Sequence, residues 1–145
     1  MRVSIACAVL GLDVYPLQAQ DAIPDLRGEW RSDTLSIVAG STPYNPARPG
    51  DTRPRVLEGE FTLTVEGQDG RRFWGTISGA RAKEKFIGAL SRDNKTGIGS
   101  DEDGTFLTNL IGPNALERCY THTHHRSKTG DSMMASCADY VRAPK

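Results

Sequence analysis

Residues 56–66 have the sequence VLEGEFTLTVE, and their alternation is the strongest structural signal in the chain. Leu57, Phe61, Leu63 and Val65 fall on one face of an extended strand, and glutamates and threonines fall on the other. This pattern is typical of an antiparallel strand with one buried face and one solvated face.

A turn and a second apolar face follow this strand. Gln68–Gly70 predicts a three-residue hairpin loop whose final glycine supplies a positive φ. Such a loop places Val65 opposite Phe73 and Leu63 opposite Gly75. The two apolar faces then match, and a slip of one residue would separate them.

The rest of the chain repeats short apolar runs between turn residues, and no helical periodicity is found after residue 20. The further predicted strands are 26–31, 34–39, 85–92, 97–101, 105–112, 115–124 and 133–142. Asp101–Gly104 is interpreted as a turn between two of them and not as a calcium loop. Eight or nine short strands predict an all-β, antiparallel up-and-down meander. We expect the meander to close into a barrel, because closure removes exposed edges.

Length and charge exclude several classes of function. The chain has 145 residues, which is enough for one domain, and it carries 18 basic and 18 acidic side chains. This balance gives no electrostatic footprint for nucleic acid or an anionic membrane. No nucleophile elbow, phosphate loop, zincin helix or Cys-x-x-Cys motif is present. We therefore expect a binding protein without covalent chemistry, and no catalytic residue is predicted.

The first residues have the pattern of a secretion signal. An apolar run, Val3–Leu12, precedes a candidate cleavage site after Ala19. We predict a signal peptide over 1–19 and one barrel domain over 20–145. The alternative, a buried first helix, is disfavoured by Pro16. The mature chain would be secreted or periplasmic, with no segment inserted in a membrane.

Cleavage would also leave an even number of cysteines. It removes Cys7 and leaves Cys119 and Cys137. In an oxidising compartment these two predict a disulfide between neighbouring strands. Pairing them directly also places His122 opposite Met134.

One segment interrupts the regular strand spacing. Residues 40–55 contain four of the eight prolines and predict a loop outside the sheet. A mobile surface excursion and a lid over a barrel mouth are both consistent with it. A structural or inhibitory protein acting through this loop is one alternative function.

Leu26–Trp30, followed by Leu35–Gly40, resembles the opening strands of avidin and streptavidin, and its Gly-x-Trp start is shared with calycin barrels. The resemblance covers about a tenth of the chain and implies a small ligand-binding barrel. Biotin binding is not implied, because the biotin proteins surround their ligand with several tryptophans and this chain has two. Leu116–Tyr120, with Ser136-Cys137 near the end, is similar to the endings of small secreted bacterial proteins of unknown function.

Aromatic residues are the predicted ligand contacts, namely Trp30, Trp74 and Tyr120. Trp74 shares the polar face of its strand, where an aromatic side chain often marks a contact surface. The alternatives are that it covers a barrel end or packs under the proline-rich loop. In a further alternative, the polar face of the sheet points inward around a ligand, and its apolar face points outward and packs against a second subunit.

All three histidines lie in the segment 121–125, and His122 and His124 project to the same face of a strand. Their spacing permits a shared Zn²⁺, Cu²⁺ or Ni²⁺ ion, although two ligands do not complete a site. A metal-dependent enzyme or metal-binding protein is therefore the second functional hypothesis, and a solvated strand end is its alternative. Glu117 and Asp139 could form an acid/base pair beside the disulfide or simply face solvent. The leading hypothesis is a secreted barrel that binds a small molecule or a protein partner.

Overall fold

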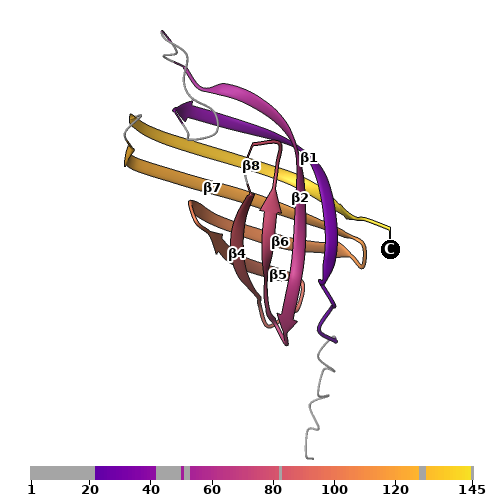
Figure 1. The fold of residues 1–145 in the computed structure, drawn as a ribbon. Coiled ribbons are helices and arrows are strands. Elements are labelled where there is room, and N and C mark those ends of the chain that lie inside the picture. Colours follow the sequence, from indigo (N-terminus) through magenta and orange to yellow (C-terminus); the bar gives the residue numbers. More distant parts are fainter. Residues whose placement is uncertain (1–21, 42–49, 51–52, 82, 128–129, 145) are drawn as a thin grey trace, which may run out of the picture.

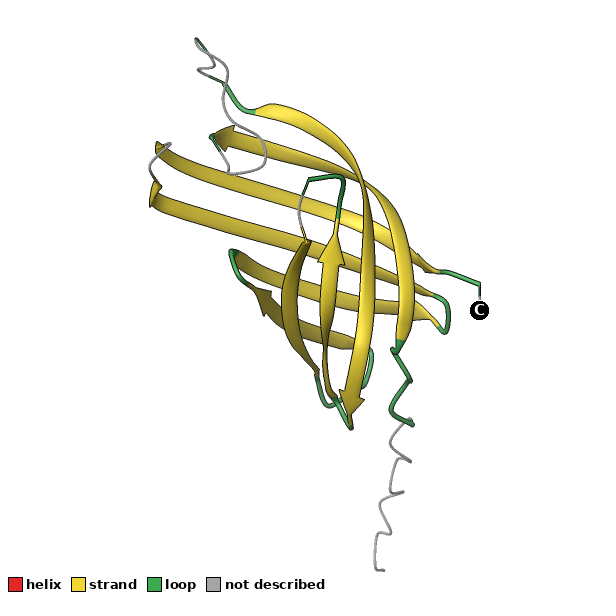
Figure 2. Cartoon of the chain, in the orientation of Figure 1, coloured by secondary structure: helices red, strands yellow, loops and turns green. Residues whose placement is uncertain are grey.

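The computed structural model describes residues 22–41, 50, 53–81, 83–127 and 130–144. The side chains of residues 123–131 are not described. The predicted signal peptide therefore lies outside the described residues. Eight strands account for most of the described chain and form a closed barrel (Figures 1 and 2). They are β1 (Gly28–Gly40), β2 (Arg55–Asp69), β3 (Arg72–Ser78), β4 (Lys83–Leu90), β5 (Thr96–Asp101), β6 (Gly104–Gly112), β7 (Ala115–Ser127) and β8 (Gly130–Arg142).

The predicted fold class is confirmed. Each strand pairs antiparallel with the next strand in sequence, and β8 pairs with β1 to close the barrel. The described residues contain no helix that is long and apolar enough to cross a membrane.

Two details of the prediction are wrong. Residues 26–31 and 34–39 do not form two strands, because β1 continues through Ser32 and Asp33. Ser32 is buried in the barrel and Asp33 faces solvent, so a polar pair interrupts the apolar pattern without interrupting the strand. The β2–β3 register also differs by two residues, since Val65 pairs with Gly75. The cause is a β-bulge at Glu66 combined with a two-residue turn that includes Gly70 (φ 55°).

The two ends of the barrel differ. The β2–β3, β4–β5 and β6–β7 turns lie at one end, where an apolar core fills the interior. The β1–β2, β3–β4, β5–β6 and β7–β8 connections lie at the other. The long strands β1, β2, β7 and β8 extend past the shorter ones toward this second end (Figure 1). We call the first the closed end and the second the open end.

Trp30 fills the bottom of the closed end. It is 1% exposed, and its indole N–H donates to the carbonyl of Leu26 at 2.9 Å. The guanidinium of Arg142 lies 4.0 Å from the centre of its ring. Arg142 also donates to the carbonyls of Asp25 and Arg27, at 2.7 and 2.6 Å. The last strand therefore holds the incoming chain over the end of the barrel.

Three phenylalanines form the centre of the core. Phe86 packs edge to face against Phe73 and Phe106, with ring centres 6.1 and 5.9 Å away. Glycines lie directly beside two of these rings on neighbouring strands, since Gly88 pairs with Phe73 and Gly99 pairs with Phe106. A methyl group added at Gly88 would collide with Phe73, and one added at Gly99 would collide with Phe106. These two glycines lie within strands, where they leave room for the aromatic rings, and they do not form turns.

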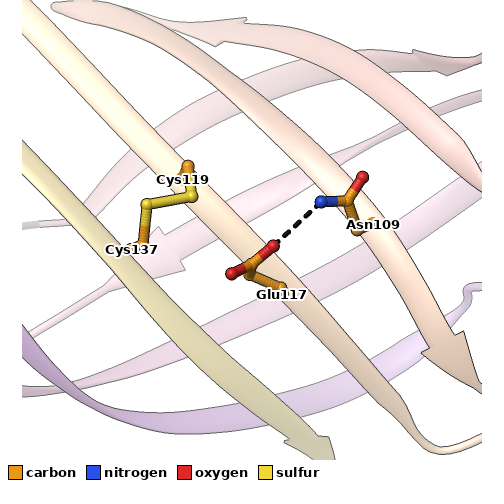
Figure 3. Close-up of a disulfide and its surroundings, with 4 residues drawn as sticks. All are labelled: Asn109, Glu117, Cys119 and Cys137. Carbon is orange, nitrogen blue, oxygen red and sulfur yellow. Dashed lines mark hydrogen bonds between the residues drawn. A yellow bond between two sulfur atoms is a disulfide. The ribbon is translucent and has the colours of Figure 1, made fainter.

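The predicted disulfide is confirmed. Cys119 of β7 and Cys137 of β8 are directly paired and bonded, with Cα atoms 4.0 Å apart (Figure 3). The predicted pairing of His122 with Met134 is also found, and in the same register Leu116 pairs with Tyr140.

The proline-rich segment begins and ends at the open end, since β1 ends at Gly40 and β2 begins at Arg55. Residues 42–49 and 51–52 lie outside the described residues, so the prediction for this loop stays a prediction there.

Candidate functional site

A cavity of about 330 Å³ occupies the open end of the barrel. This volume lies at the lower limit for small-molecule sites in proteins, roughly 300–1,000 Å³. The cavity floor is the apolar core of the closed end. Hydroxyl, carboxylate, guanidinium and imidazole groups line its sides together with apolar side chains.

One face of β7 supplies the central polar groups. Leu116, Arg118, Tyr120 and His122 alternate along the strand and point inward, opposite the face that carries Cys119. Leu116 belongs to the core, and the other three inward residues line the cavity. The disulfide thus fixes this strand from outside without entering the cavity.

Arg118 lies at the base of the cavity with its side chain 3% exposed. Its guanidinium stacks 3.9 Å from the centre of the Phe106 ring, and its Nη2 lies 3.5 Å from Oδ2 of Asp101. The Asp101 side chain is likewise 3% exposed, so the pair is removed from water. The Nε–H of Arg118 has no hydrogen-bond partner among the described residues.

Asp101 ends β5 and organises the adjoining turn. Its Oδ1 accepts hydrogen bonds from the amides of Asp103 and Gly104, at 3.2 and 2.8 Å. The same oxygen accepts from the hydroxyl of Tyr120 at 3.2 Å. The predicted turn at 101–104 is therefore present, and its first carboxylate also belongs to the cavity.

Tyr120 connects this acid to His122, whose Nδ1 lies 3.3 Å from the tyrosine oxygen. Burial raises the pKa of Tyr120, and the nearby carboxylates of Asp101 and Glu84 raise it further. Burial also raises the pKa of Tyr140, which lies deeper in the barrel. Both phenols therefore stay protonated at neutral pH and can serve as hydrogen-bond donors.

An apolar wall completes the cavity. Phe61, Ile77 and Met134 line it from β2, β3 and β8, and the first two pack against the core. The hydroxyls of Ser36 and Ser136, on the paired strands β1 and β8, lie among the polar lining. The cavity therefore offers both apolar contact and hydrogen bonds.

The structure separates the predicted ligand contacts. Tyr120 lines the cavity, whereas Trp30 lies in the core of the closed end. Trp74 is on the outer face, 45% exposed, with its ring over Gly67. His122 is buried in the cavity wall, and the side chain of His124 lies outside the described part of the chain.

Among the described residues no group of three His, Cys, Asp or Glu side chains could hold a metal ion. The metal hypothesis for His122 and His124 stays a prediction.

The sequence interpretation missed Arg118, Asp101 and Glu84. None of the three was predicted as a ligand contact, yet Glu84 is half-buried and lines the cavity with the other two. The available signal was the position of Arg118, which shares a strand face with Leu116 and Tyr120. A charge within a run of inward-facing residues indicates a polar cavity.

The proposed acid/base pair lies elsewhere. Glu117 and Asp139 pair across β7 and β8 on the outer face, and Glu117 accepts from the amide of Asn109 at 2.8 Å (Figure 3). Asp139 is exposed.

No protein-family model matches this chain, and a search of the curated proteins finds no match. The assignment of function therefore depends on the geometry of the cavity.

Proposed function

We propose that this protein is a secreted or periplasmic barrel that binds a small amphipathic molecule in its open-end cavity. The observation that carries the proposal is the buried guanidinium of Arg118 at the base of a 330 Å³ cavity, whose Nε–H has no partner in the part of the chain that the structure describes. Buried polar groups in proteins are nearly always hydrogen-bonded. The surrounding side chains cover this atom, and a ligand acceptor that reaches it would satisfy the group.

The division of the barrel into two ends supports the same function. The core of the closed end gives a rigid floor, so the cavity does not need to form on binding. The apolar wall of Phe61, Ile77 and Met134 would contact the less polar part of the ligand. The disulfide between β7 and β8 is consistent with an oxidising compartment.

The proposal is tested with N-phenyl-1-naphthylamine, an uncharged probe whose fluorescence rises in apolar surroundings. We expect one saturable site in the oxidised protein. Exposed apolar residues on the outer face, among them Trp74, Ile87 and Ile98, could also bind such a probe, so a control is needed.

Two successive residues of β8 provide that control. Ser136 points into the cavity and Ala135 points outward, so Ser136→Trp fills the cavity while Ala135→Trp adds the same ring outside. We expect Ser136→Trp to abolish saturable binding and Ala135→Trp to retain it, with circular dichroism confirming the fold. If Ser136→Trp does not fold, Met134→Trp, also in the cavity wall, replaces it. Equal binding by the filled and control variants contradicts the proposal.

A further inference from the structure

We infer that the cavity takes an organic cation, namely an amine with an apolar body and a hydrogen-bond acceptor. This inference rests on the proposed function and names the class of ligand.

The charge of the cavity differs from that of the chain. The chain as a whole is neutral, but three carboxylates and two guanidinium groups line the cavity from inward-facing strand positions and the adjoining turns, a net charge of −1 without His122. These groups belong to Glu84, Asp101, Asp103, Arg81 and Arg118, whereas the side chains of Glu58 and Glu60 are exposed on the outer face of β2. A concave site with apolar walls concentrates such a field and raises the local concentration of cations.

The negative charge is concentrated around the hydroxyl of Tyr120. Asp101 accepts a hydrogen bond from this hydroxyl at 3.2 Å, Glu84 and Asp103 line the same cavity, and all three carboxylates raise the pKa of the phenol. An ammonium group placed there would be attracted by all three. The phenol oxygen and its ring would add a hydrogen-bond acceptor and a cation–π surface.

The buried guanidinium below this point does not favour an acidic ligand. Asp101 already balances the charge of Arg118 at 3.5 Å. A ligand carboxylate beside Arg118 would place a second negative charge in the same buried site, where desolvation is costly. An uncharged acceptor, such as a hydroxyl or carbonyl oxygen, can meet the Nε–H of Arg118 without that cost.

The inference is tested with three matched probes that share a phenol ring. Tyramine carries an ammonium group, tyrosol a hydroxyl and 4-hydroxyphenylacetate a carboxylate. Isothermal titration calorimetry at pH 7 should give a Kd for tyramine about tenfold below that of tyrosol, with the acid binding weakest. The preference for tyramine should shrink as salt is raised.

Two neutralising variants locate the charge. Glu84→Gln removes a carboxylate from the cavity wall and should reduce the preference for tyramine over tyrosol several-fold. Glu66→Gln removes an exposed carboxylate from the outer face and should leave the preference unchanged.

Three results would overturn the inference: tighter binding of the acid, equal binding of all three compounds, or no binding of any of them. Each result leaves the proposed function standing if N-phenyl-1-naphthylamine still enters the cavity. Failure of that uncharged probe contradicts the proposed function itself, so the two failures are distinguishable.

Discussion

Arg118 and Asp101 form a charge pair that is almost fully removed from water at the base of the cavity. The pair connects the core to the ligand site, because the guanidinium stacks on Phe106 while the carboxylate holds Tyr120. Removing one member of a buried pair leaves an uncompensated charge, which costs about 3–5 kcal/mol.

We therefore predict that Arg118→Met and Asp101→Asn each lower the free energy of unfolding by about 3 kcal/mol. The double variant should lose clearly less than the sum of the two single losses, since neither charge remains. Urea denaturation of the four proteins measures this cycle. Strictly additive losses would show that the two groups are not coupled.

The buried phenols predict a pH dependence of stability. The pKa values of Tyr120 and Tyr140 are raised mainly by burial, so the folded protein binds these protons more tightly than the unfolded chain does. Their contribution is complete below the ordinary tyrosine pKa, about 10, and is lost as pH rises above it. The urea midpoint should therefore fall above pH about 10.

The matched variant for this prediction is Tyr120→Phe with Tyr140→Phe. It lacks both phenols and should show a shallower decline over the same pH range. An identical decline in the two proteins would assign the alkaline loss of stability to other groups.

At the scale of strands, the disulfide and the packing glycines determine the rigidity of the cavity walls. Cys119 and Cys137 are 18 positions apart in sequence, and the bond closes the β7–β8 hairpin. Chain-entropy arguments give about 3 kcal/mol for a loop of this length.

We predict that Cys119→Ser with Cys137→Ser lowers the melting temperature by roughly 10 °C. Calorimetry of the oxidised and variant proteins measures the shift. The same shift should follow reduction of the parent protein. If the variant has the same melting temperature as the parent protein, the disulfide does not contribute to thermal stability.

The strand glycines give a second prediction at this scale. A methyl group at Gly99 would collide with Phe106 and the Ile87 carbonyl, so Gly99→Ala should cost about 1–3 kcal/mol. Gly112, in the neighbouring strand β6, has open space around it, and Gly112→Ala should change stability by less than about 0.5 kcal/mol. Chemical denaturation compares the two. A larger loss at Gly112 would contradict the packing role of Gly99.

The strands show what the sequence can and cannot predict. Strict alternation in β2 and the cysteine pair in β7 and β8 were sufficient for strand type and for the β7–β8 register. The β2–β3 register was not predicted, because the bulge at Glu66 leaves no distinct mark in the alternation. β1 was divided in two because its inward residues turn polar as the strand passes from the core to the cavity.

The site was predicted less completely than the fold, again because inward strand residues become polar where the strands line the cavity. Tyr120 and His122 were recognised by their residue types, and the structure places both in the cavity wall. Arg118 and Asp101 were not recognised, because a lone charge in a short strand usually faces water. Only barrel closure turns that strand face inward and brings the two charges together.

At the scale of the whole molecule, the barrel divides one interior into two functional parts. Apolar side chains fill the closed end, and polar and apolar side chains surround a space at the open end. The outer face carries the disulfide and several exposed apolar side chains, which lie apart from this space. The central claim is that ligands enter the open end.

The most direct measurement of that claim is the pattern of backbone amide shifts during titration with N-phenyl-1-naphthylamine, followed by heteronuclear NMR. We predict saturable changes at inward residues of the open end, including Ser36, Tyr120 and Ser136, with little change at the core residues Trp30 and Leu90. Changes confined to the outer face, around Trp74 and Ile98, would contradict the claim that the cavity is the binding site.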